Sequence, residues 1–155
     1  MPRGIRRFSV LSGLALCAVL CGPIAVAQAS DNTLRATLNS FAPKIVKDEN
    51  AVHNGLIGYP QGKVKPLVRA LSHEVSDLHS LKGKLANDSA SSAQGATGRA
   101  DIIKGLGLIA KAYGALLKDV KAAHGGPVPA AKVNAAVKTD KKGRKNLLAG
   151  LHLLA

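Results

Sequence analysis

Tryptophan is absent from this chain of 155 residues, and aromatic residues together make up only 3% of it. This scarcity argues against a β-sandwich, whose strands are enriched in aromatic and β-branched residues. The core must instead be built from Leu, Ile, Val and Ala, which suits helices that pack closely through small side chains. We therefore expect an all-α fold.

Cysteine is also scarce, and the two cysteines, Cys17 and Cys21, both lie in an N-terminal stretch with the pattern of an export signal. Arginines open this stretch, an apolar run over residues 8–20 follows, and small residues suited to cleavage end it. We expect residues 1–29 to be a signal peptide that is removed. The mature protein would then contain no cysteine and no disulfide bond, so its fold would depend on core burial alone.

Two other interpretations of this stretch fit the sequence less well. The apolar run is roughly long enough for a membrane anchor, which needs about 20 residues, but Pro23 and the small residues after it suit a processing site better. A lipoprotein signal would place a small residue immediately before the cysteine, where this chain has Leu16 and Leu20. We therefore expect export to the periplasm or the extracellular space.

Acidic residues are few, because nine Asp and Glu stand against 22 Lys and Arg, which gives a formal net charge of +13. Removal of the signal peptide takes away Arg3, Arg6 and Arg7 and no acid, so the charge falls by three to +10. The sequence shows no pair of catalytic carboxylates, no Gly-x-Ser-x-Gly nucleophile motif and no cysteine after cleavage. We therefore predict a basic protein that is not an enzyme.

The remaining residues, 30–155, are enough for one domain with a substantial core. Apolar residues recur in them at steps of three and four, the spacing of amphipathic helices. Breaks rich in turn-forming residues separate four such segments, which we expect at about 32–57, 64–87, 91–123 and 128–154. Four amphipathic helices joined by short breaks predict an antiparallel up-down four-helix bundle.

The apolar stripes that should face the core differ in regularity. The first comprises Leu34, Leu38, Phe41, Ile45, Val52 and Leu56, and the second comprises Val64, Val68, Leu71, Val75, Leu78, Leu81 and Leu85. The third comprises Ile102, Leu106, Ile109, Tyr113, Leu116 and Val120, and the fourth comprises Val133, Val137, Leu147, Leu151 and Leu154. Asp48 and Glu49 interrupt the first stripe, and Asp140 and Arg144 fill the middle of the fourth. A last helix that is split around residues 141–143 is therefore an alternative.

Two local features add expectations about helix geometry. Pro43 lies inside the first segment, where its ring would clash with the preceding turn and kink the helix. The small residues Gly107, Ala110 and Gly114 of the third segment would let a neighbouring backbone approach closely.

Candidates for metal or cofactor binding are sparse. His73 and Asp77 are four residues apart, the spacing of a two-ligand metal clip, but the second stripe places both on the solvent side. Haem would need a ligand that faces the core, and Tyr113 is the candidate that lies on a stripe. We expect the Tyr113 ring to pack in the core, with its hydroxyl directed to a helix end. A di-iron site is excluded because residues 30–155 contain only Glu49 and Glu74 as glutamates. We predict neither a metal nor a cofactor.

Positive charge gathers in the last two segments. Lys104, Lys111 and Lys118 are seven residues apart and would form one ridge of the third helix. The last helix carries a second cluster, formed by Lys138, Lys141, Lys142, Arg144 and Lys145. Such ridges attract anionic polymers or lipid head groups through an electrostatic field that salt weakens. Because aromatic residues that could stack on bases are scarce, sequence-specific nucleic-acid binding is not expected. A solvated surface without a partner is the alternative.

The C-terminal stretch, residues 146–155, is nearly apolar and directly follows the basic cluster. We expect it to be the buried end of the last helix, and self-association or membrane docking through it is the alternative.

The sequence thus predicts a non-enzymatic binding or structural component of the cell envelope or extracellular space, which contacts anionic polymers or membrane surfaces. A carrier of haem or a small apolar ligand, held between the helices near Tyr113, is the alternative function.

Overall fold

The computed structural model describes residues 32–154, so the predicted signal peptide, residues 1–29, lies outside the described residues. The described part consists of four α-helices and one short 3-10 helix, and it contains no strand. The elements are α3 (Asn32–Gly58), η1 (Tyr59–Gln61), α4 (Val64–Asn87), α5 (Ala93–Ala122) and α6 (Ala130–Leu154). The predicted all-α class is confirmed. The helix ends lie within two residues of the expected ranges, and α6 is continuous through residues 141–143.

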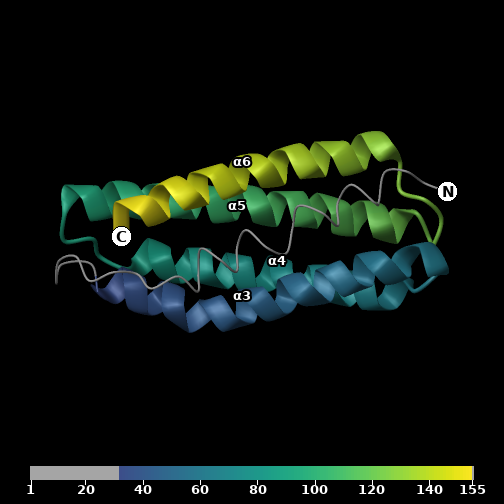
Figure 1. Ribbon diagram of the computed structural model, residues 1–155, viewed down its shortest axis with the longest axis horizontal. Coiled ribbons are helices and arrows are strands. Elements are labelled where there is room, and N and C mark those ends of the chain that lie inside the picture. Colours follow the sequence, from purple (N-terminus) through teal and green to yellow (C-terminus); the bar gives the residue numbers. More distant parts are fainter. Residues whose placement is uncertain (1–31, 155) are drawn as a thin grey trace.

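The four helices lie side by side in two layers, with α5 and α6 in one layer and α3 and α4 in the other (Figure 1). Close packing joins α3 to α4, α4 to α5 and α5 to α6. At one end of the molecule, the Tyr59 hydroxyl donates a hydrogen bond to the Gly126 carbonyl oxygen at 2.5 Å. At the other end, the Arg35 guanidinium donates to the Leu154 carbonyl oxygen. These two contacts tie η1 to the loop between α5 and α6, and α3 to the end of α6.

The core follows the predicted stripes on α3 and α5, where every stripe residue is buried. α3 also continues through Pro43, whose ring is exposed. The second helix differs, because Val64, Val68 and Val75 are only partly buried. The buried face of α4 is instead formed by Leu67, Ala70, Leu71, Glu74, Leu78, Leu81 and Leu85. The predicted register of α4 is therefore rotated slightly, and this rotation brings Glu74 into the interior.

α5 and α6 pack most closely where glycines face each other. A Cβ atom added to Gly105 would lie 2.7 Å from the Gly143 carbonyl oxygen, and one added to Gly150 would lie 2.5 Å from the Gly98 carbonyl oxygen. Within each helix the two glycines are seven residues apart, so they lie on one side of that helix. The backbones of α5 and α6 therefore touch at two levels, where larger side chains would hold them apart.

The predicted positions of close approach, Gly107 and Gly114, are wrong. A Cβ atom on Gly114 would have no heavy atom within 4 Å, and one on Gly107 would meet only the flexible Lys82 ammonium group at 3.8 Å. Ala110 is buried in the core as expected. The difference arises because α6 lies over the side of α5 that carries Gly98 and Gly105.

Candidate functional site

Four helices contribute ionisable side chains to one region of the interior, which we call the buried charge layer. It comprises Glu49 from α3, Glu74 from α4, Tyr113 from α5, and Asp140 and Arg144 from α6. All five side chains are buried, and Glu74 and Tyr113 are both 0% exposed. Charged residues are almost never fully buried unless they are paired, so this layer is the most unusual feature of the core.

Arg144 is the centre of the buried charge layer. Its Nε atom donates to Asp140 Oδ2 at 2.9 Å, one helical turn away on α6. Its Nη2 atom donates to Glu49 Oε1 at 2.7 Å and to the Tyr113 hydroxyl oxygen at 3.1 Å. One guanidinium group thus links α6 to both α3 and α5, using the several donors that its planar fork provides.

The environment shifts the pKa of Arg144, Glu49 and Tyr113. Burial lowers the pKa of Arg144, but the neighbouring Tyr113, Asp140 and Glu49 outweigh burial and hold the pKa above its ordinary value. Burial raises the pKa of Glu49 against the opposing effect of Arg144. Burial also raises the pKa of Tyr113 well above its ordinary value. Arg144 therefore remains charged, and Tyr113 remains a neutral phenol.

Glu74 is the most isolated member of the layer. Neither of its carboxylate oxygens has a hydrogen-bond partner among the described residues. Burial, followed by the negative charges of Glu49 and Asp48, raises the pKa of Glu74 to about 9. Since an ionised carboxylate without partners is very costly in an apolar interior, the group takes up a proton instead. At neutral pH, Glu74 is therefore a neutral carboxylic acid.

Replacement of Glu74 with Gln is expected to flatten the pH dependence of stability. The folded-state pKa of about 9 lies above the ordinary value of 4.5, so the folded protein keeps a proton that the unfolded chain releases. This stabilising contribution is complete below about pH 4.5 and falls by up to about 1.4 kcal/mol per pH unit until about pH 9. Urea unfolding of both proteins across this range should show the Gln variant gaining relative stability as the pH rises. Parallel curves would contradict this assignment.

The structure corrects one residue of the predicted anion-binding cluster. Arg144 is only 8% exposed, and its guanidinium binds Glu49 and Asp140. It therefore cannot serve as a surface contact for an anionic polymer. The physical reason is its position on the core-facing side of α6, in the same register as the buried Leu147 and Leu151.

Tyr113, the cofactor candidate, is completely buried and its hydroxyl oxygen accepts a hydrogen bond from Arg144. The prediction that this hydroxyl points to a helix end is wrong, because Arg144 meets it within the interior. A ligand that bound at Tyr113 would have to displace an established ion network. No observation in the described residues therefore favours the carrier function.

The metal candidates on α4 differ in exposure, because the side chain of Asp77 is partly buried and faces α3. His73 is exposed, and Asp77 Oδ1 lies 3.7 Å from the Lys44 ammonium group. Burial, and then a hydrogen bond with Asp77, raise the pKa of Asp48 on the neighbouring helix. Even so, among residues 32–154 no three His, Cys, Asp or Glu side chains are grouped in a way that could hold a metal ion.

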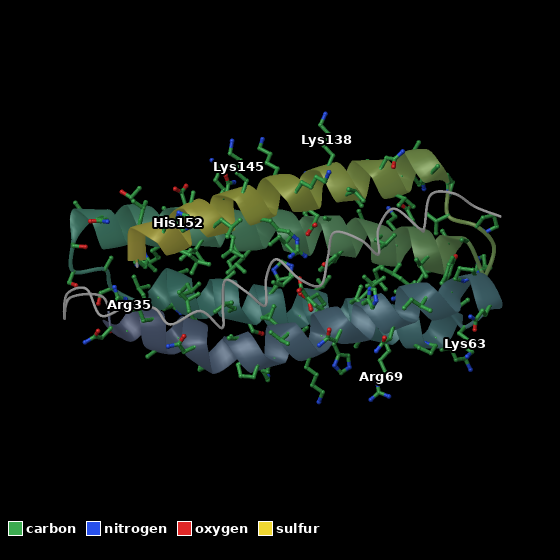
Figure 2. All side chains as sticks on the ribbon, in the orientation of Figure 1. Arg35, Lys63, Arg69, Lys138, Lys145 and His152 are labelled. Carbon is green, nitrogen blue, oxygen red and sulfur yellow. The ribbon has the colours of Figure 1, made fainter. Side chains whose placement is uncertain are left out.

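Of the exposed lysines on α5 and α6, we call seven the lysine face. They are Lys104, Lys111, Lys118, Lys138, Lys141, Lys142 and Lys145. Figure 2 shows Lys138 and Lys145 pointing away from the other helices on the same side of α6. Within the described part of the chain, none of the seven has a carboxylate within 4.0 Å. Lys132, by contrast, lies 2.6 Å from Asp119 and is therefore partly neutralised.

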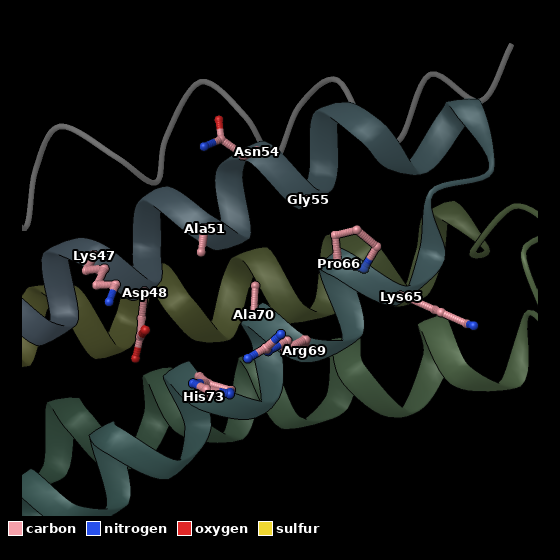
Figure 3. A pocket seen from close by; sticks show the side chains of 10 residues that line it. All are labelled: Lys47, Asp48, Ala51, Asn54, Gly55, Lys65, Pro66, Arg69, Ala70 and His73. Atoms are coloured by element: carbon pink, nitrogen blue, oxygen red, sulfur yellow. The ribbon is translucent and has the colours of Figure 1, made fainter.

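A groove of about 710 Å³ lies between α3 and α4. Its lining residues are Lys47, Asp48, Ala51, Asn54, Gly55, Lys65, Pro66, Arg69, Ala70 and His73. Figure 3 shows Asp48 pointing from α3 toward α4, where Arg69 and His73 lie next to each other. The small residues leave the space between the two helices unfilled, and the long basic side chains border this space.

The apolar C-terminal stretch is largely used inside the fold. Leu147, Leu151 and Leu154 are buried, and Leu148 and Leu153 are partly buried. The one exposed large apolar side chain in the described part is Ile57 on α3, at 53% exposure. The described surface therefore offers little apolar area around residues 146–154.

None of the helices over residues 32–154 combines the length and the apolar character that crossing a membrane requires. No protein family, curated protein or solved structure matches this chain. The function must therefore be argued from the charge distribution and the geometry described above.

Proposed function

We propose that this protein is exported after cleavage of residues 1–29 and folds as an antiparallel up-down four-helix bundle. In this proposal it is a non-enzymatic binding or structural component of the cell envelope or extracellular space. Its partner is an anionic envelope polymer, which it contacts through the lysine face. The predicted export signal supports the location. The net charge of +10 that remains after its removal supports the negative sign of the partner.

The observation that carries the proposal is the lysine face itself. Seven ammonium groups stand on two neighbouring helices, and no described carboxylate lies within 4.0 Å of them. The glycine contacts bring the α5 and α6 backbones together, so the two rows of lysines stand on directly neighbouring helices. Unpaired surface charges of one sign raise the local concentration of oppositely charged polymers, and counterion release makes such binding depend steeply on salt.

Neutralising part of the lysine face is expected to weaken polymer binding and its salt dependence. Lys138, Lys141 and Lys145 follow one another at steps of three and four along α6, so they share one side of the helix. Replacing all three with Gln should reduce the slope of log K against log salt by about one for each lysine that contacts the polymer. Binding of dextran sulfate, measured by calorimetry at several salt concentrations, checks this.

The matched control removes the same number of charges from the other layer. Lys44, Lys63 and Lys84 are exposed on α3, at the η1 turn and on α4. Their replacement with Gln lowers the net charge equally but leaves the lysine face intact. If both triple variants lose affinity to the same extent, net charge alone attracts the polymer, and the lysine face is not a binding surface.

A further inference from the structure

The groove between α3 and α4 is hollow because small residues meet there. Ala51 and Gly55 line it from α3, and Pro66 and Ala70 line it from α4. A Cβ atom on Gly55 would lie 2.8 Å from the Leu67 Cα atom, so the two helices touch beside the groove. The groove is thus a fixed feature of a close helix contact, rather than a gap between mobile side chains.

The border of the groove is cationic on both sides. Lys47 stands on α3, while Lys65, Arg69 and His73 follow one another at steps of four along α4. Steps of four place side chains on one side of a helix, with a rise of about 6 Å from one to the next. None of these four basic side chains has a carboxylate within 4.0 Å among residues 32–154. They are therefore available to an anion in the groove.

Asp48 is the one acidic residue that lines the groove. Its side chain is only 9% exposed, and burial followed by a hydrogen bond with Asp77 raises its pKa. The nearby His73 and Lys44 act in the opposite direction on that pKa. Because burial favours the neutral form of the Asp48 carboxyl group, this residue opposes an anion less than an exposed carboxylate would.

From this geometry we propose that the groove binds a phosphoryl group at Arg69, while Lys47 and Lys65 add positive charge toward the two ends of the groove. The planar guanidinium of Arg69 can donate two parallel hydrogen bonds to phosphate oxygens, and the lysines add point charges. Three cations match a group that carries two or more negative charges better than they match a single carboxylate. The site lies in the opposite layer from the lysine face, so it goes beyond the function proposed above and does not depend on it.

Pyrophosphate is a suitable soluble probe, because it carries two phosphoryl groups and the groove admits more than one. Calorimetry with the purified protein should detect binding, and Arg69→Gln should weaken it by roughly tenfold through loss of a charge-assisted hydrogen bond. Lys118→Gln makes the same change of charge on the lysine face. It should weaken binding by less than about twofold, because Lys118 lies on α5, which does not line the groove, and salt screens distant charges.

A steric variant separates a shaped site from a general positive field. Ala51 is exposed and lines the groove, so Ala51→Leu fills part of the hollow and leaves every charge in place. Leu is also a good helix former, so folding should be preserved, which circular dichroism checks. Pyrophosphate binding should fall with Ala51→Leu if the groove is the site, and unchanged binding would overturn the proposal.

A second probe distinguishes soluble phosphoryl compounds from lipid head groups. Vesicles of phosphatidylcholine with and without phosphatidylglycerol present the same phosphate chemistry on a surface. If the protein binds one of the probes, and both Arg69→Gln and Ala51→Leu abolish that binding, the result supports the site. The probe that binds then identifies the source of the phosphoryl group. Absence of binding to both probes, or equal loss in Arg69→Gln and Lys118→Gln, overturns it. Neither outcome decides the lysine-face experiment, which uses other residues.

Discussion

Replacement of Arg144 with Met is expected to destabilise the protein by about 3–5 kcal/mol, the usual consequence of removing one partner of a buried ion pair. The variant would leave Glu49 and Asp140 buried without the cation that binds them at 2.7 and 2.9 Å. Urea unfolding followed by circular dichroism measures the loss. A loss below about 1 kcal/mol would mean that the network is not formed as described, because exposed ion pairs contribute that little.

A compensated variant tests the same network from the opposite direction. When Glu49→Leu and Asp140→Leu are combined with Arg144→Met, no buried charge remains uncompensated in the network. Replacing a whole buried ion cluster with apolar residues of similar size is often neutral or stabilising by about 1–4 kcal/mol. The triple variant should therefore recover most of the stability that Arg144→Met alone loses. A triple variant less stable than Arg144→Met would show that the network contributes net stability.

Replacement of Gly150 with Ala is expected to destabilise the protein by about 1–3 kcal/mol, since extra atoms in a tightly packed contact force backbone shifts. The new Cβ atom would lie 2.5 Å from the Gly98 carbonyl oxygen and 2.8 Å from the Ile102 amide nitrogen. Both neighbours belong to the backbone of α5, so neither can rotate away. Thermal and urea unfolding of the variant check the expectation.

Gly114→Ala is the matched control for this contact. The same change in α5 meets no heavy atom within 4 Å, so only the difference in helix propensity remains. Alanine in a helix interior is favoured over glycine by about 0.5–1 kcal/mol, and this variant should therefore be more stable than the original. Similar effects of both substitutions would contradict the close contact between α5 and α6.

Much of the fold is readable from the sequence because the apolar spacing of α3 and α5 is regular. Every residue of those two stripes is buried, and the helix ends follow local turn and break residues. The register of α4 is harder to predict, because two sets of residues could face the core. One set is Val64, Val68 and Val75, and the other is Leu67, Ala70 and Glu74. Apolar residues stood on both sides of that helix, so spacing alone did not settle its register.

The sequence indicates the positions of the buried charge layer but not its pairing. Glu49, Asp140 and Arg144 occupy positions at which the stripes continue, so their location already indicated burial. Because charged residues interrupt the apolar stripe of α6, Arg144 is expected on the surface. In the structure it has two buried acidic partners. Pairing between residues that are 95 positions apart depends on the tertiary arrangement, which periodicity does not contain.

The lysine face and the groove between α3 and α4 also differ in how much of each can be predicted from the sequence. The spacing of Lys104, Lys111 and Lys118 was sufficient to predict an exposed ridge, because residues seven apart lie on one side of a helix. The groove cannot be predicted from the sequence, because residues of two helices form it at the place where Gly55 lets α3 and α4 touch. Sequence spacing within one helix cannot show which residues of another helix lie opposite.

The most direct test of the lysine face as a binding surface is to map the contact residue by residue. Amide chemical shifts of the isotopically labelled protein should be recorded during titration with short dextran sulfate fragments at low salt. We expect the largest changes to gather around residues 104–118 and 138–145, and added salt to reverse them. Changes that are absent there, or spread evenly over all four helices, would contradict it.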